Sequence, residues 1–180
     1  MRGFSSIGLL APKINANVGG ALRAAACYGA SSIIIQGARY HRNCADVTAA
    51  HRHIPLFHCD NLHDMIPFDA VPIAIEFDPG SVSLFEFQHP ERAFYIFGPE
   101  DGSLGAKTTS WCKHKVFVPT KFCMNLAATV NVVLYDRAFK LSGAGGGVGA
   151  REQGFGTKGQ RKGHSDGGIV GQINTSATSN

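Results

Sequence analysis

The chain has 180 residues, of which 44% are hydrophobic, and a formal net charge of +4 at pH 7. This length suits one domain and this composition supplies a core, which excludes a disordered or fibrous protein. The mild basic charge permits a nucleic-acid partner without requiring one. Residues 1–17 contain too few apolar positions for a signal peptide or a membrane span, which predicts a cytosolic protein with no membrane association.

Short apolar runs with the length and residue types of buried strands recur through the first 118 residues. We expect strands at 7–11, 32–36, 54–58, 71–77, 93–97 and 115–118. Helical patterns separate several of these runs. Strands that alternate with helices predict an α/β domain, with a mostly parallel sheet covered by helices on both faces.

Two helices have clear boundaries in the sequence. The first is expected to have Asn17 as its N-cap, to continue through small residues to Ala26, and to end at a left-handed Gly29. The last is expected near residues 125–140, where Asn125 is a plausible N-cap. The apolar face of that last helix consists of Leu126, Val130, Val133 and Leu134.

The composition changes at residue 141. Twelve of the 22 glycines fall in the last forty residues, together with a small excess of basic side chains. Such a segment buries too little apolar surface to offset its ordering entropy. We therefore expect a folded domain at 1–140 and a flexible, mildly basic tail at 141–180.

Two motifs follow expected strands. Gly98-Pro99-Glu100 comes after the fifth strand, and the sixth strand ends in Val118-Pro119, with Asn125 opening the helix beyond. Ligands of parallel α/β sheets bind at the carboxyl ends of strands, where small residues expose the backbone. The two segments therefore predict two halves of one pocket for a small polar cofactor.

A third motif opens the first helix. Arg23 lies roughly 40° around the helix axis from Gly19 and about one turn further along, so its long side chain can lean back toward the strand ends. Gly20 and the alanines that follow it give the helix a smooth surface. Such a surface suits close approach of another backbone, from a second subunit or a nucleic acid.

Together these motifs resemble those of the TrmH (SpoU) branch of the SPOUT superfamily of RNA methyltransferases, which methylates ribose 2′-hydroxyls. Asn17 to Arg23 is similar to N-x-G-x-x-x-R and Gly98-Pro99-Glu100 to G-P-E. The segment with Val118-Pro119 and Cys123-Met124-Asn125-Leu126 is similar to I-P…S-[LM]-N-[VL]. The resemblance covers roughly residues 6–138. It implies a C-terminal deep trefoil knot, a homodimer, and S-adenosylmethionine held in the knot.

The resemblance also implies the site residues, and a tRNA or rRNA substrate. The catalytic set it implies is Arg23, Asn17, Glu100 and Asn125. The cofactor-binding set it implies is Ile75, Glu76, Phe77, Gly98, Val118, Cys123 and Leu126. The chain departs from the family pattern at Cys123, where Ser is usual, and at Ser103, where Gly is usual. A thiol is a poorer hydrogen-bond partner than a hydroxyl, so Cys123 would tune activity.

Arg23 is the central residue of the expected mechanism. Family proposals make the matching Arg the base that removes the ribose proton, but a guanidinium with a pKa above about 12 is a poor base. We expect Arg23 to hold an RNA phosphate and to stabilise the forming alkoxide. Asn17 and Asn125 would orient neighbouring groups, and Glu100 would fix the knot loop or Arg23.

Simpler interpretations stay open for several residues. Asn17 and Asn125 can act as helix caps only, and Glu100 can bond backbone N–H groups of its own turn. Phe122 can stack on a base or pack internally, whereas Trp111 and Phe117 are expected in the core. His51, His53, His58, Cys59 and His63 match no standard zinc spacing, and the five cysteines lack any CxxC pair, so we expect no metal and no disulfide.

Two other functions compete with the methyltransferase. One is a catalytically silent RNA-binding dimer of the same fold, which the Cys123 substitution makes conceivable and the presence of Arg23, Glu100 and Asn125 opposes. The other is a flavodoxin-like binder of small molecules, which the lack of a phosphate-binding turn after the first strand disfavours. Cofactor binding and methyl transfer distinguish the three.

Overall fold

The computed structural model describes residues 3–39 and 54–143 of the chain. Its strands are β1 (Phe4–Leu10), β2 (Ile33–Gln36), β3 (Leu56–Cys59), β4 (Val71–Ile75), β5 (Val82–Ser83), β6 (Arg92–Phe97) and β7 (His114–Phe117). Its helices are α1 (Asn15–Tyr28), α2 (Gly105–Thr109) and α3 (Leu126–Leu141), with a short 3-10 helix at Leu62–Met65. No helix in these ranges is long and apolar enough to cross a membrane.

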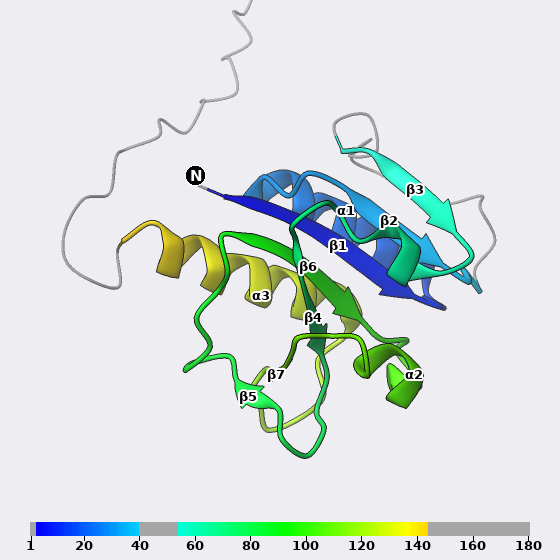
Figure 1. Ribbon diagram of the computed structural model, residues 1–180. Helices are drawn as coiled ribbons and strands as arrows, with labels where there is room; N and C mark the ends of the chain where they lie inside the picture. The colour runs from blue at the N-terminus through cyan, green and yellow to red at the C-terminus, as the bar shows by residue number, and fades with distance from the viewer. Residues whose placement is uncertain (1–2, 40–53, 144–180) are drawn as a thin grey trace, which may run out of the picture. The chain divides into compact units, whose positions relative to one another are not determined.

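The described strands form one sheet in the order β3-β2-β1-β6-β4-β7-β5, and every pairing between them is parallel (Figure 1). The predicted parallel α/β sheet is therefore confirmed. The expected tail lies outside the described residues from position 144 onward. Its boundary with the folded domain stays a prediction.

Two apolar clusters cover the two faces of the sheet. Ile33 and Ile35 belong to one cluster and Ile34 to the other, because successive side chains of a strand point to opposite faces. Residues of α1 and α3 complete the first cluster. Leu62 of the 3-10 helix and Leu104, just before α2, complete the second. Helical segments thus lie on both faces, as predicted.

The predicted helix boundaries are partly right. Gly29 ends α1 in the left-handed conformation, with φ of 68°. Asn125 caps α3, and its Oδ1 accepts from the N–H of Ala128 at 2.8 Å. The predicted N-cap at Asn17 is wrong, because α1 begins at Asn15 and Asn17 lies within its first turn. From this position the Asn17 side chain donates a hydrogen bond to Glu100, in the loop that follows β6.

The small residues of α1 serve packing within the chain. A Cβ on Gly20 would lie 2.6 Å from the Cβ of Ala127 in α3, so only glycine permits this approach of the two helices. Ala21, Ala24 and Ala25 are buried. The smooth surface expected to meet a second subunit or a nucleic acid therefore meets α3 at Gly20, and Ala21, Ala24 and Ala25 belong to the core.

The sequence does not reveal β5, which has two residues and no apolar run. It pairs with β7, and β7 also pairs with β4, so β7 lies between two strands that precede it in the chain. The β4 strand itself ends at Ile75, two residues before the expected end. Glu76 and Phe77 are consequently loop residues at the carboxyl edge of the sheet.

A polar chain fixes the last two turns of α3 against β6. Arg137 Nη1 donates to the Tyr95 hydroxyl at 3.2 Å, which lies 2.6 Å from His89 Nδ1. His89 Nε2 lies 2.8 Å from Asp136 Oδ2. Burial lowers the pKa of His89 despite the opposing Asp136 carboxylate, and burial raises the pKa of Tyr95 to about 12. A neutral His89 therefore donates through Nε2 and accepts from Tyr95.

Replacing His89 with Gln is expected to destabilise the domain by about 1–3 kcal/mol, because the change breaks a buried chain of hydrogen bonds. Stability should also depend on pH. The pKa of His89 is lower in the folded state than in the unfolded state. The contribution of His89 to the free energy of unfolding is therefore complete above pH 6.5, its unfolded pKa, and declines as the pH falls below 6.5. Urea unfolding between pH 8 and 5.5 measures both effects. If His89→Gln loses as much stability at low pH as the wild type does, His89 is not the source of the pH dependence.

Candidate functional site

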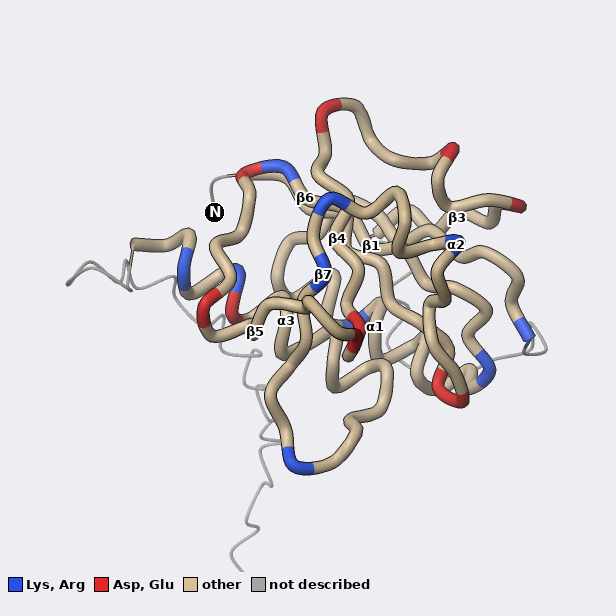
Figure 2. The backbone as a smooth tube through the Cα atoms, turned by 60° about the horizontal axis from the view of Figure 1, so that its bottom comes forward, with Lys and Arg blue, Asp and Glu red and all other residues tan. Residues whose placement is uncertain are grey.

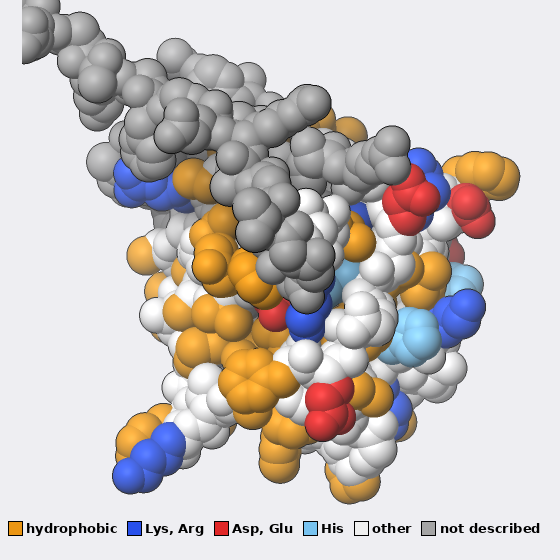
Figure 3. Space-filling model, turned by 90° about the vertical axis from the view of Figure 1, so that its left-hand side faces the viewer, with side chains coloured by type: hydrophobic (Ala, Val, Ile, Leu, Met, Phe, Trp, Pro, Cys, Tyr) orange, Lys and Arg blue, Asp and Glu red, His pale blue; other side chains and the backbone are white. Residues whose placement is uncertain are grey.

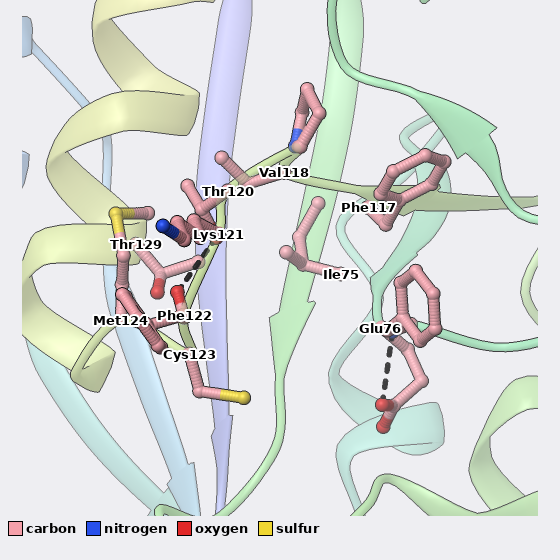
Figure 4. A pocket seen from close by; sticks show the side chains of 12 residues that line it. Ile75, Glu76, Phe117, Val118, Thr120, Lys121, Phe122, Cys123, Met124 and Thr129 are labelled. Atoms are coloured by element: carbon pink, nitrogen blue, oxygen red, sulfur yellow. Dashed lines mark hydrogen bonds between the residues drawn. The ribbon is translucent and has the colours of Figure 1, made fainter.

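A pocket of about 370 Å³ opens where β4 and β7 end, and we name it the β4–β7 pocket (Figure 4). On one side lie the last residue of β4, the two residues after it, and Phe117 of β7. The loop from Val118 to Met124 forms the other side, with Thr129 of α3. Its full lining is Ile75, Glu76, Phe77, Phe117, Val118, Pro119, Thr120, Lys121, Phe122, Cys123, Met124 and Thr129.

The pocket contains five of the seven residues proposed for cofactor binding, namely Ile75, Glu76, Phe77, Val118 and Cys123. The other two, Gly98 and Leu126, do not line it. The Leu126 side chain is only 6% exposed because it packs in the core at the start of α3. Gly98 follows β6, and a Cβ there would lie 3.3 Å from the backbone nitrogen of Leu104.

Glu76 joins the pocket to the turn after Gly98. Its Oε2 accepts from the Ser103 hydroxyl at 2.9 Å and from the Leu104 N–H at 2.7 Å. We name residues 98–104 the GPE loop. Ser103, which replaces the usual glycine of the family pattern, thus supplies a hydrogen bond that glycine lacks. Sequence reasoning missed this role because the partners are 27 residues apart.

Glu100 anchors the GPE loop to the start of α1. Its carboxylate accepts from the backbone N–H groups of Lys13 at 2.8 Å and Ile14 at 3.1 Å, and from Asn17 Nδ2 at 2.9 Å. Partial burial alone would raise the pKa of Glu100, but the hydrogen bonds from Asn17 and the backbone outweigh it and lower the pKa. Glu100 is therefore a carboxylate at neutral pH, and it joins the Gly98-Pro99-Glu100 motif to the Asn17–Arg23 motif.

A second, more exposed anchor lies beside Glu100. Asp101 accepts from Arg39 at 2.6 Å and from Lys13 Nζ at 3.2 Å. These two cations hold the pKa of Asp101 well below its usual range, with Arg39 the stronger influence. The GPE loop is thus fixed at Glu100, at Asp101 and, through Glu76, at Ser103 and Leu104.

The remaining predicted catalytic residues lie apart from the pocket lining. Arg23 is exposed on α1 and is not among the residues that line the β4–β7 pocket. Asn125 is also exposed, and its side-chain oxygen caps α3. The cap interpretation of Asn125 is therefore confirmed, and a catalytic role for it stays a prediction.

Aromatic side chains surround the mouth of the pocket. Phe122 is 77% exposed and Phe77 is 85% exposed, so neither packs internally. Lys121 Nζ lies 5.7 Å from the centre of the Phe122 ring. Phe117, expected in the core, instead lines the pocket and meets Phe77 edge to face at 5.4 Å between ring centres. Trp111 is half-buried against the second cluster, so the prediction that it packs in the core is confirmed only in part.

Charges on the described residues are mixed in sign. Figure 2 shows Lys and Arg interspersed with Asp and Glu along the loops and ends of the elements. Of the histidine-rich stretch, His51 and His53 lie outside the described residues. Among those described, no three His, Cys, Asp or Glu side chains are placed to hold a metal ion.

Several solved structures share this fold. The SpoU methyltransferase AviRb from Streptomyces viridochromogenes aligns with a TM-score of 0.70 at 18% identity, over 79% of this chain and 62% of AviRb. A structure that gives insights into the 2-OH methylation of C/U34 on tRNA aligns with a TM-score of 0.68 at 23% identity, over 78% of this chain and 98% of the other. The TrmH/SpoU tRNA modifying enzyme of A. aeolicus aligns with a TM-score of 0.68 at 13% identity, over 78% and 77% of the two chains.

At these identities the structural likeness establishes the fold alone, and this chain spans less than two thirds of the length of AviRb. No curated protein sequence matches the chain at a significant level. A model of the SpoU rRNA Methylase family, however, matches residues 5–135. This match covers most of the chain and all three motifs, and the chain therefore belongs to the SpoU rRNA methylase family.

Proposed function

We propose that the protein is an S-adenosylmethionine-dependent methyltransferase that modifies a ribose 2′-hydroxyl of tRNA or rRNA. The observation that carries the proposal is the β4–β7 pocket, which the motif beginning at Val118-Pro119 builds at the carboxyl edge of the sheet. Family membership supports RNA methylation. Among structures of this fold, AviRb is in complex with the cofactor AdoMet, and another concerns 2-OH methylation on tRNA.

The pocket fits the cofactor in size and in chemistry. Its volume of about 370 Å³ is within the range of small-molecule sites. Ile75, Phe117, Val118 and Met124 offer apolar surface for a purine ring, whereas the backbone after β4 and β7 offers polar groups. S-adenosylmethionine, when bound, supplies a methyl group on a positively charged sulfur.

The residues of the chain have separate tasks in the proposed reaction. A ribose hydroxyl is a weak nucleophile, so the site must orient it and stabilise the negative charge that develops as its proton leaves. Arg23, exposed and outside the pocket lining, holds an RNA phosphate and offers positive charge to the forming alkoxide. Glu100 and Asn17 hold the start of α1, which carries Arg23, against the GPE loop.

A deep trefoil knot belongs to the same proposal. Its support is the order of the strands: β4, β5 and β6 precede β7 in the sequence, and β7 lies between β4 and β5 in the sheet. Leu84 N donates to Phe117 O at 2.8 Å and Glu76 N to Val116 O at 2.9 Å, so β7 is bonded on both sides. In the proposed knot, the chain after β6 threads through an earlier loop, which places β7 between β4 and β5.

A homodimer is also proposed, through the outer face of α3. Tyr135 and Phe139 are 59% and 46% exposed, and their rings stack with 6.5 Å between centres. Tyr28 of α1 meets Tyr135 edge to face. Figure 3, which views the side where α3 ends, shows hydrophobic side chains gathered over much of that surface. Exposed aromatic surface of this kind is typical of protein contacts.

The direct test is transfer of labelled methyl from S-adenosylmethionine to total tRNA and rRNA, followed by nuclease digestion and nucleoside mass analysis. We expect a 2′-O-methylated nucleoside, whose identity also reveals the RNA class. Methylation on a base would refute the ribose assignment. Cofactor binding without transfer to any RNA would favour the silent RNA-binding dimer, and failure to bind the cofactor would refute the methyltransferase.

A further inference from the structure

A second hollow, of about 420 Å³, opens at the same edge of the sheet, and we name it the β1–β2 hollow. Leu10, the last residue of β1, and Gln36, the last residue of β2, lie in its wall. Strand β6 separates it from the β4–β7 pocket, since the sheet order is β2-β1-β6-β4-β7. Neither the motifs nor the proposed methyl transfer accounts for this hollow.

The wall of the β1–β2 hollow is rich in hydrogen-bond donors. Gln36 Oε1 accepts from the Leu62 N–H at 2.8 Å, and Asn61 Oδ1 accepts from the His63 N–H at 3.3 Å. Both amides therefore keep their NH2 groups as donors. Lys107 adds an ammonium group and lies exposed on α2. A wall that offers cationic and N–H donors favours a ligand with anionic oxygens.

Two aromatic rings give the hollow a surface for a flat ligand. Trp111 and His63 both line it, and their rings meet edge to face at 5.2 Å between centres. Trp111 is half-buried against the second apolar cluster, which fixes its position. Asp64, whose carboxylate lies 3.6 Å from the His63 ring, is not part of the lining. Nucleobases stack on such fixed aromatic rings.

The GPE loop lies between the two sites. Leu104 lines the β1–β2 hollow, and its N–H donates to Glu76, which lines the β4–β7 pocket. One short loop, anchored at both ends, thus separates a site for methyl transfer from a site with phosphate-binding and base-stacking groups. A single RNA strand crossing this edge of the sheet can reach both.

We propose that the β1–β2 hollow binds a nucleotide of the RNA substrate other than the one that is methylated, with Trp111 stacking on its base and Lys107 contacting phosphate. This inference rests on the proposed function, because it takes RNA as the substrate. It assigns the choice of RNA partly to residues outside the three family motifs.

The chain contains one tryptophan, so its fluorescence reports on this hollow directly. The full-length protein is titrated with a short single-stranded RNA, with AMP and with inorganic phosphate, while Trp111 emission is recorded. We expect saturable quenching by the RNA, because stacking on a base quenches indole emission. An affinity for AMP or phosphate as high as that for RNA would identify a site for a free nucleotide or a free anion and would overturn the proposal.

Variants separate stacking from charge. Lys107→Ala should weaken binding of labelled RNA and lower the slope of log affinity against log salt by about one, whereas Lys113→Ala should not. Lys113 is the matched control, because it is also an exposed lysine but lies at the opposite edge of the sheet, where the strands begin. Its backbone N–H donates to Pro72 O near the start of β4. Trp111→Ala should weaken binding by about 5- to 150-fold, and Trp111→Phe should retain most of it.

The binding and methylation measurements together show whether the nucleotide site fails alone or whether the proposed function fails with it. Cofactor affinity, measured by calorimetry, should stay at the wild-type value in Lys107→Ala, which shows that the fold is intact. RNA that is bound and methylated without a change in Trp111 emission would overturn the nucleotide site and leave the proposed function standing. A protein that binds cofactor but neither binds nor methylates RNA would overturn both.

Discussion

Arg23→Ala is expected to lower methyl transfer by at least about 100-fold while cofactor affinity stays at the wild-type value. Removal of one donor that stabilises transition-state charge costs about 10²- to 10³-fold in other enzymes. Cofactor binding should survive because Arg23 is exposed on α1 and does not line the β4–β7 pocket. Single-turnover transfer and calorimetry with S-adenosylmethionine measure the two effects separately.

Two companion variants define the role of Arg23. Arg23→Lys keeps the charge but loses the planar fork, so we expect partial activity if the side chain binds phosphate and acts by charge. Lys113→Ala removes an exposed charge elsewhere and should leave transfer unchanged. If Arg23→Ala turns over at a near-normal rate, Arg23 has no part in the mechanism. Loss of cofactor binding would show that it supports the pocket instead.

Glu100→Gln is expected to lower both stability and methyl transfer. The new amide presents its NH2 to groups that are themselves donors, namely the N–H groups of Lys13 and Ile14 and the amide of Asn17. The expected loss is about 1.5 kcal/mol, the lower end of the range for hydrogen bonds to charged groups, because Glu100 is half-exposed. Urea unfolding at pH 7 measures it.

The pH dependence provides an internal check on Glu100. Its pKa is lowered in the folded state, so its contribution to stability is complete above the unfolded value of 4.5 and is lost as the pH falls further. The difference in stability between wild type and Glu100→Gln should therefore shrink in that acidic range. Asp101→Asn, which removes the neighbouring exposed carboxylate, is the matched control and should cost less than Glu100→Gln at pH 7. If the two variants lose the same stability, the hydrogen bonds of Glu100 to the start of α1 contribute no more than the exposed ion pairs of Asp101.

Strands that are apolar along their whole length could be predicted closely, whereas β1 begins at Phe4, three residues before its expected start, because Ser5 and Ser6 interrupt its apolar pattern. The β2 strand, Ile33–Gln36, has three buried isoleucines in succession because both of its faces are covered, and its prediction was accurate to one residue. The two-residue β5 strand had no such signal, because it forms only where β7 provides a partner. Asn17 was misplaced as a cap because the residue that satisfies its side chain, Glu100, is 83 positions away.

The sequence by itself determined the alternation of strands and helices, the turns at Gly29 and Gly98, the two motifs at strand ends and the motif in the first helix. These are local properties, since apolar runs, caps and glycines act over a few residues. The tertiary structure decided which distant residues meet: Glu100 with Asn17, Glu76 with Ser103, and Trp111 with His63. Such pairs depend on the order of strands in the sheet, which no local pattern encodes, and the β1–β2 hollow follows from that order.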